Sequence, residues 1–137
     1  MNRYLMDTGS ASDFVNRRAG VPDRVRERLA AGDRVGIGTP VMGELLAGIE
    51  LSASRQKNLD RPRHVIGSLV VWPFDHRAAQ EYGRLFAVLR RIGRPMQQFD
   101  IQIAAVAFSL GNRVVVSKDS DLSAVPGLSI ENWSDRS

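Results

Sequence analysis

The chain has 137 residues, of which 43% are hydrophobic and 25% charged, a composition typical of one globular domain covering residues 1–137. The absence of cysteine excludes disulfides and thiolate metal sites, and the net charge of +4 is compatible with a polyanionic partner without requiring one. No apolar run is long enough to cross a membrane, and the polar start does not resemble a signal peptide, so we expect a cytoplasmic protein.

The first predicted strand, at residues 4–6, ends at Asp7. Turn-forming residues then lead into a helix that we expect to begin at Ser10 or Ser12 and to run to about Arg18. Asp7 could cap that helix, but the two serines are able to do so instead. The acid would then face the carboxyl edge of the sheet, where α/β proteins place their sites. We therefore interpret Asp7 as a functional acid.

A helix at residues 22–31 and a strand at 35–38 precede a second helix, which Thr39 caps and Pro40 opens. Glu44 lies roughly opposite the main apolar stripe of this second helix, a position that alone predicts a solvent-facing acid. Its own face is also apolar or small, however, so we expect the helix to be covered on two sides and Glu44 to face a cleft. The main stripe is Met42, Leu45, Leu46 and Ile49, and the second stripe is Val41, Gly48 and Leu51.

Residues 52–63 are polar and basic, and we predict the end of a helix and a mobile loop there. This segment is either a strip for phosphate contacts or a solvated connector. His64 follows it and receives no functional assignment. A strand at residues 70–74 comes next, and then a helix that Asp75 caps and that runs to Leu89.

Asp100 opens a buried helix that stops at Gly111, and its neighbours on the same helix face are apolar. A carboxylate in such a place must accept hydrogen bonds, be protonated or face a cation. It could simply cap its helix by accepting a bond from the backbone N–H of residue 102 or 103. The strand at residues 114–116, however, brings Asp119 or Asp121 to the same sheet edge, so these acids could converge with Asp100.

Helices and short strands alternate up to a last strand at residues 128–130 and a polar end that contains Trp133. This alternation predicts a three-layer α/β/α sandwich around a mostly parallel sheet. Clustered acids without cysteine or a zinc-type histidine spacing suit a hard divalent cation, Mg²⁺ or its substitute Mn²⁺. Such ions, often in pairs, activate water and stabilise the leaving oxygen of a phosphodiester, so the acids point to a nuclease.

Four motifs, taken in their order and spacing, resemble the PIN domain, and more closely the VapC toxins of bacterial toxin–antitoxin pairs. The resemblance covers nearly the whole chain, with departures at Gly9, where family members commonly have Asn or Ser, and at Phe99. The motifs are Asp7-Thr8 after the first strand, the run from Gly43 to Gly48 around Glu44, Asp100 with the residues up to Ala105, and the run from Ser117 to Leu122 before the turn at 125–128.

The resemblance implies a PIN fold and a Mg²⁺-dependent endoribonuclease that cleaves RNA. It also implies a cognate antitoxin protein, which inhibits the enzyme by inserting a segment into the site, and usually a homodimer. The site residues that it implies are the metal ligands Asp7, Glu44, Asp100 and either Asp119 or Asp121, with the hydroxyls of Thr8 and Ser117 holding ligands or phosphate.

Two other interpretations stay open at this point. A strand-end aspartate with Mg²⁺ also occurs in phosphotransfer enzymes and receiver modules, although Gly9 stands where a haloacid-dehalogenase-type phosphatase would need a second acid. A non-catalytic RNA-binding or interaction domain would use the basic segments, and its acids would only cap helices. Dependence of RNA cleavage on divalent ions distinguishes a nuclease from such a binder.

Overall fold

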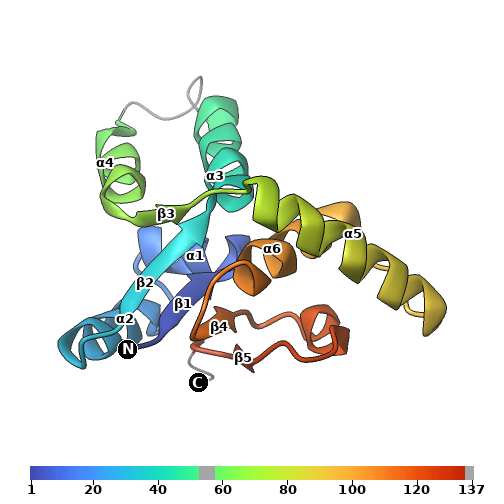
Figure 1. The fold of residues 1–137 in the computed structure, drawn as a ribbon. Coiled ribbons are helices and arrows are strands. Elements are labelled where there is room, and N and C mark those ends of the chain that lie inside the picture. The colour runs from blue at the N-terminus through green and yellow to red at the C-terminus, as the bar shows by residue number, and fades with distance from the viewer. Residues whose placement is uncertain (53–57, 135–137) are drawn as a thin grey trace.

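The computed structural model describes residues 1–52 and 58–134. At its centre lies a five-stranded sheet in the order β3-β2-β1-β4-β5 (Figure 1). Each strand pair is parallel, which confirms the predicted α/β sandwich with a mostly parallel sheet. The strands are β1 (Arg3–Met6), β2 (Arg34–Gly38), β3 (Val70–Trp72), β4 (Arg113–Val116) and β5 (Ile130–Glu131).

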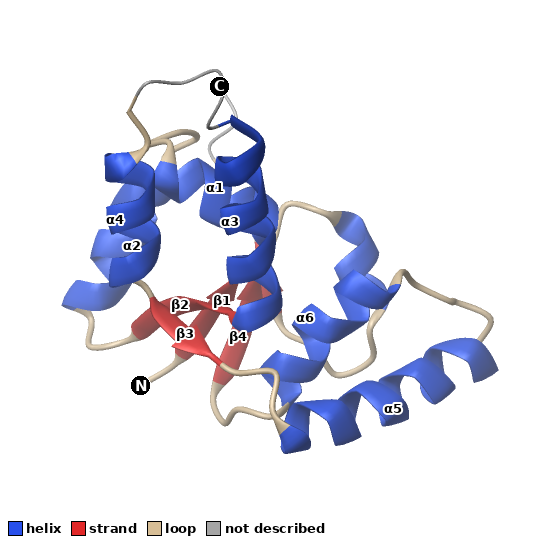
Figure 2. Cartoon of the chain, turned by 90° about the horizontal axis from the view of Figure 1, so that it is seen from above, coloured by secondary structure: helices blue, strands red, loops and turns tan. Residues whose placement is uncertain are grey.

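Helices cover both faces of this sheet. Figure 2 shows α1 to α4 gathered on one side and α5 with α6 on the other. Within the described ranges, no helix combines the length and the apolar character that crossing a membrane requires. The helices are α1 (Thr8–Val15), α2 (Val21–Ala30), α3 (Thr39–Ser52), α4 (Asp60–Ser68), α5 (His76–Arg91), α6 (Gln98–Phe108) and the short 3₁₀ helix η1 (Ser120–Ala124).

The strand order reverses between β1 and β4. Strands β2 and β3 lie on one side of β1, whereas β4 and β5 lie on the other. Met6 pairs with Val116, and the backbone N–H of Asp7 donates to the Val116 carbonyl at 2.9 Å. The loops after β1 and β4 therefore start side by side, at the kind of switch point where open α/β sheets form ligand sites.

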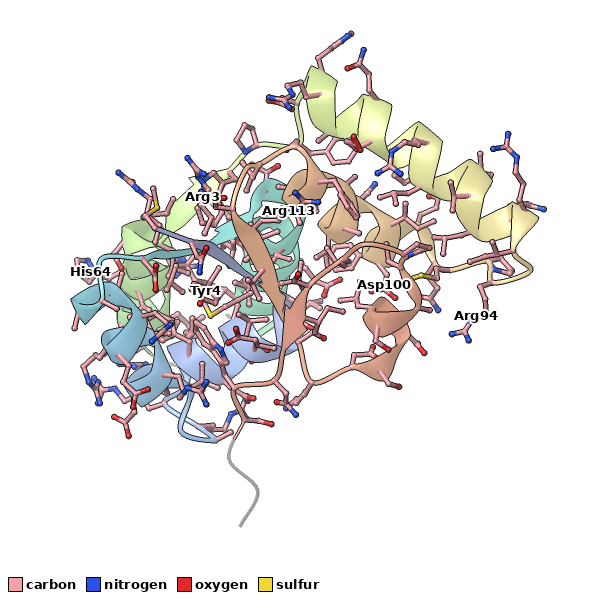
Figure 3. The ribbon with its side chains drawn as sticks, turned by 60° about the horizontal axis from the view of Figure 1, so that its bottom comes forward. Arg3, Tyr4, His64, Arg94, Asp100 and Arg113 are labelled. Atoms are coloured by element: carbon pink, nitrogen blue, oxygen red, sulfur yellow. The ribbon has the colours of Figure 1, made fainter. Side chains whose placement is uncertain are left out.

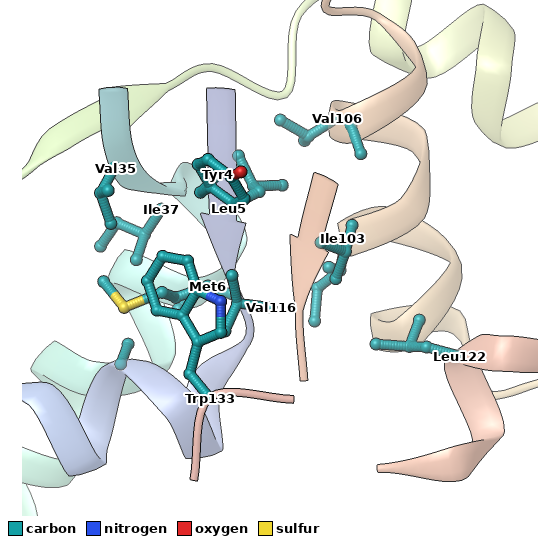
Figure 4. Packing of buried hydrophobic residues seen from close by; sticks show 14 of the residues in the cluster. Tyr4, Leu5, Met6, Val35, Ile37, Ile103, Val106, Val116, Leu122 and Trp133 are labelled. Carbon is teal, nitrogen blue, oxygen red and sulfur yellow. The ribbon is translucent and has the colours of Figure 1, made fainter. Parts of the chain in front are cut away.

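Trp133 is part of the hydrophobic core, so the polar end predicted for this stretch is wrong at this residue. Its side chain is 1% exposed, and its ring centroid lies 5.2 Å from that of Tyr4 (Figure 4). The indole N–H donates to the Glu131 carboxylate at 2.9 Å, which satisfies the one polar atom of the ring. Trp133 thereby packs the segment after β5 against β1, the strand that leads to Asp7.

Gly36 in β2 is required by the close approach of the neighbouring strand. It pairs with Val70 of β3, and a Cβ atom at this position would collide with the backbone carbonyl of Val70. Any side chain on Gly36 would therefore push β3 away from β2. Gly36 is therefore required for the packing of β2 against β3, and its presence does not indicate a loop.

The helices α3 and α4 depart from the prediction. Helix α4 begins at Asp60, so residues 60–63 are helical and the loop predicted there is wrong. The predicted loop also includes residues 53–57, which lie outside the described part of the chain. In α3, Leu51 is 80% exposed, so this helix is not covered on two sides. The polar sequence of α4 offers few apolar positions from which a helical period can be recognised.

Candidate metal centre

Asp7 follows β1 directly and is 7% exposed. Its Oδ1 accepts a hydrogen bond from the backbone N–H of Ser10 at 2.8 Å, which makes it the N-cap of α1. Its Oδ2 accepts a second bond from the Ser117 hydroxyl at 2.6 Å. The expectation that Ser10 or Ser12 caps this helix in place of Asp7 is therefore wrong. Asp7 caps α1 and lies at the sheet edge at the same time, because a carboxylate has two oxygens with spare lone pairs.

Ser117 links the loop after β1 to the loop after β4. Its hydroxyl donates to Asp7 and also accepts the backbone N–H of Asp119 at 2.9 Å. Asp119 in turn caps η1 by accepting the backbone N–H of Asp121 at 2.9 Å. One buried hydroxyl thus fixes the relative positions of the segments that carry Asp7 and Asp119.

Asp100 is the third residue of α6, whose N-cap is Gln97, so the capping alternative does not describe it. Burial raises the pKa of its carboxyl above the ordinary value, and the negative charges of the surrounding acids raise the pKa further. Carboxylate oxygens of Asp100, Asp119 and Asp121 lie within 4.8 Å of one another. The acids whose negative charges raise the pKa of Asp100 are Asp119, Asp121, Asp7 and Glu44.

A cavity of about 290 Å³ at the carboxyl edge of the sheet brings together Asp7, Glu44, Asp100 and Asp119. Asp121 lines a separate hollow of about 160 Å³ on the other side of Asp100, together with Arg94. Figure 3 shows Arg94 farther from the sheet than Asp100. Asp119 shares one cavity with the other three acids, whereas Asp121 comes close to Asp100 and Asp119 from the neighbouring hollow, so both candidates for the fourth acid lie at the site.

The residues of this cavity fit a hard divalent cation. Its carboxylates supply only oxygen ligands, as Mg²⁺ and Mn²⁺ prefer, and their mutual repulsion is relieved by a bound cation. Thr8 lines the same cavity, and its buried Oγ1 has no hydrogen-bond partner among the described residues. Leaving a buried hydroxyl unpaired is costly, so this atom is available to a bound ligand.

Lys118 and Asp13 also belong to this region, and the sequence analysis missed their pairing. The Lys118 ammonium donates to Asp13 Oδ2 at 3.0 Å, and Lys118 lines the acid cavity. The two residues are separated by 105 positions and come from α1 and from the loop after β4. No local periodicity could have predicted the pair, because only the parallel arrangement of β1 and β4 brings them together.

A larger cavity of about 350 Å³ opens beside the acid cavity and shares Thr8 and Glu44 with it. Its walls come from α1, α3, α4 and the residue before α4. The expectation that Glu44 faces a cleft is confirmed, since this acid lines both cavities. The apolar residues of the larger one are Val15, Leu45, Ile49, Leu59, Pro62 and Ile66.

Comparison with known proteins gives consistent results. The model of the PIN domain matches residues 4–128. The tRNA(fMet)-specific endonuclease VapC of Salmonella typhimurium is 31% identical over 97% of this chain and 99% of its own. The DNA-bound VapBC structure from Salmonella typhimurium matches with a TM-score of 0.84 at 29% identity, over 97% of this chain and 99% of that chain. The VapBC2 structure from Rickettsia felis matches with a TM-score of 0.83 at 23% identity, over 96% and 98%. The chain therefore belongs to the PIN-domain family and is of the VapC type.

Proposed function

We propose that this protein is the toxin of a toxin–antitoxin pair and acts as a divalent-metal-dependent endoribonuclease. The observation that carries the proposal is the cavity that joins Asp7, Glu44, Asp100 and Asp119 at the switch point of the sheet. The activity named for the relatives supports it, since they are an endonuclease and ribonucleases of the VapC type. An arrangement of carboxylates without a nucleophilic thiol suits metal-assisted hydrolysis of a phosphodiester.

In this proposal Asp7, Asp100 and Asp119 hold the cation, and Glu44 contacts it directly or through water. Mg²⁺, or Mn²⁺ in its place, supplies activation of water and stabilisation of the charge on the leaving oxygen. Asp121 is the alternative to Asp119 in this ligand set, because its carboxylate also lies within 4.8 Å of that of Asp100, although it lines the neighbouring hollow. Burial raises the pKa of Asp100, and the charges of the surrounding acids raise it further, so the ionised carboxylate is disfavoured without a cation.

Two hydroxyl groups complete the proposed site. Ser117 holds Asp7 and the backbone of Asp119 in place, so that the carboxylates of both residues are oriented before substrate binds. The unpaired hydroxyl of Thr8 is positioned to donate to a phosphate oxygen or to a water molecule in the cavity. Such preorganisation lowers the cost of assembling a charged transition state.

A cognate antitoxin is the protein partner that we propose. The related structures from Salmonella typhimurium and Rickettsia felis are VapBC complexes. The apolar cavity between α1, α3 and α4 supports such a partner, because a bound segment there would lie next to Glu44 and Thr8 and could block the acid cavity. The homodimer implied by the family resemblance is part of the proposal, and sedimentation of the purified chain tests it.

The test of the catalytic proposal is cleavage of RNA by the purified chain with Mg²⁺ and with a chelator. Total RNA and initiator tRNA are both suitable, the latter because of the name of the relative from Salmonella typhimurium. We expect cleavage with Mg²⁺ that disappears in Asp7→Asn and in Asp100→Asn, whereas Asp23→Asn, on the exposed part of α2, serves as the matched control.

Cleavage that persists in the chelator, or full activity of either cavity variant, would contradict the proposed mechanism. Binding of RNA that depends on salt but not on divalent ions, with no cleavage under any condition, would favour the non-catalytic interpretation. Relief of toxicity or of cleavage by the co-expressed partner protein tests the antitoxin part separately.

A further inference from the structure

Lys118 is the basic residue among those that line the acid cavity. Its ammonium lies 3.0 Å from Asp13 Oδ2, and its side chain is 49% exposed while that of Asp13 is 8% exposed. A lysine ammonium has three N–H donors, so a single bond to Asp13 leaves donors free for another anion. Lys118 is thus a half-exposed residue of the cavity wall whose ammonium is bonded to a buried acid.

The position of Lys118 is fixed from more than one side. Asp13 is anchored in α1 and also contacts Arg18, with 3.5 Å between its Oδ1 and the arginine Nε. At Gly9, a Cβ atom would lie 3.7 Å from Lys118 Cε and 3.8 Å from Asp7 Oδ1. Both distances are ordinary van der Waals contacts, so the lysine stem and the Asp7 carboxylate both lie beside Gly9.

The cavity needs a positive charge besides a divalent ion if it is to accept RNA. A divalent ion offsets only half of the charge of four ionised carboxylates, so a phosphate that approaches the cavity is still repelled. An ammonium at the rim reduces this repulsion where the phosphate arrives. A lysine held by a buried carboxylate would supply that charge without ordering a free side chain on binding.

We propose that Lys118 contacts a non-bridging phosphate oxygen of RNA bound over the acid cavity, and that Asp13 is the residue that positions it. The assignment rests on the proposed ribonuclease function for the identity of the polyanion. The simpler alternative is that the Lys118–Asp13 pair only ties α1 to the loop after β4. That alternative predicts an effect on stability and none on RNA binding.

The test is binding of a fluorescently labelled single-stranded RNA to the full chain at several salt concentrations, with Ca²⁺ in place of Mg²⁺ to occupy the carboxylates and with gel analysis to verify that the RNA stays intact. We expect Lys118→Met to weaken binding severalfold and to lower the slope of log K against log salt by about 0.7, the value for one phosphate contact on a single strand. Lys118→Arg keeps the charge and should keep the slope. Arg26→Met is the matched control, because it removes one positive charge that pairs with Asp23 in α2, outside the cavity.

The positioning role of Asp13 is tested by cleavage with Mg²⁺. Asp13→Asn should lower kcat/KM in the wild-type background and have no further effect in Lys118→Met, because it acts through the lysine. Thermal unfolding of each variant establishes that the protein is folded at the assay temperature. A purely structural pair would lower the unfolding temperature of the variants but leave kcat/KM unchanged at a temperature where they are folded.

The outcomes separate this inference from the proposed function. Wild-type cleavage that needs Mg²⁺, together with equal affinity and equal salt slope for Lys118→Met and wild type, overturns the assignment of Lys118 alone. A wild type that neither binds nor cleaves RNA overturns both. A Lys118→Met effect no larger than that of Arg26→Met also overturns the assignment, since it would reflect only net charge.

Discussion

Replacing Asp100 with asparagine should stabilise the metal-free protein against unfolding and abolish the further stabilisation that Mg²⁺ gives the wild type. Asparagine has nearly the same shape as aspartate but no charge, so the packing over Ile103 of α6 is kept. The pKa of Asp100 is raised by burial and then by the charges of the surrounding acids, so the ionised side chain is under repulsion at neutral pH. The same charge that the proposed site needs for the cation therefore destabilises the fold in its absence.

The size of this effect follows from the spacing of the acids. Carboxylate oxygens of Asp100, Asp119 and Asp121 lie within 4.8 Å of one another, a separation at which two unit charges repel by about 0.9 kcal/mol in water. Asp119 and Asp121 are exposed, so this water value applies. Removing the charge of Asp100 relieves two such repulsions, or about 2 kcal/mol, which raises the unfolding temperature of a domain of this size by roughly 5 °C.

The assay is thermal unfolding at low ionic strength, with a chelator and with Mg²⁺. We expect the variant to unfold at a higher temperature than wild type in the chelator, and Mg²⁺ to stabilise wild type only. The raised pKa of Asp100 also determines how its contribution to stability changes with pH. The carboxyl favours folding below its unfolded pKa, near 3.8, and this contribution is lost as the pH rises through its folded pKa. The difference between the two proteins should therefore vanish near pH 3.8. An unchanged or lower unfolding temperature for the variant at neutral pH would refute the reasoning.

Three further predictions concern the site and the sheet. Affinity for Mg²⁺, measured by calorimetry, should begin to fall with decreasing pH above the ordinary pKa of aspartate, because the cation competes with a proton on Asp100. Ser117→Ala removes the bond to Asp7 and the acceptor for a backbone N–H, and should weaken Mg²⁺ binding about 10–100-fold and cost about 1–3 kcal/mol in urea unfolding. Gly36→Ala should destabilise the fold by about 1–3 kcal/mol because its Cβ collides with the backbone of β3, whereas Gly83→Ala, in an open position of α5, should be neutral or stabilising by up to about 1 kcal/mol.

The periodicity of the chain was sufficient to predict the sheet and most helices. Short apolar runs at residues 4–6 and 114–116 became β1 and β4, since buried parallel strands consist almost entirely of apolar residues. Helix α5 was recognisable from its cap at Asp75, and helix α6 as a buried helix because its residues 103–107 are all apolar and buried. Helix α4 was not, because Asp60 and the arginines of its first turns make it resemble a polar connector.

For the candidate site, the sequence indicated which acids matter but not how they are held. The switch-point rule placed Asp7 and the acids after β4 at one edge of the sheet, whereas Glu44 was joined to them only by the family resemblance. The dual role of Asp7 was not predictable, because both serines near it were plausible caps. The pair of Lys118 and Asp13 depends on contacts between residues far apart in sequence, which no local pattern contains.

The four acids of the cavity are held in place in two different ways. This difference explains how the site can be stable without its cation and still bind one. Asp7 and Asp119 each cap a helix, and the Ser117 hydroxyl joins Asp7 to the backbone of Asp119, so hydrogen bonds hold both carboxylates in place. Asp100 and Glu44 instead project from within α6 and α3. Burial raises the pKa of the half-buried Asp100, and the charges of the surrounding acids raise it further. A cation bound between these two pairs would draw Asp100 and Glu44 toward Asp7 and Asp119, which are already held in place. Binding of the metal should therefore tighten the packing of α3 and α6.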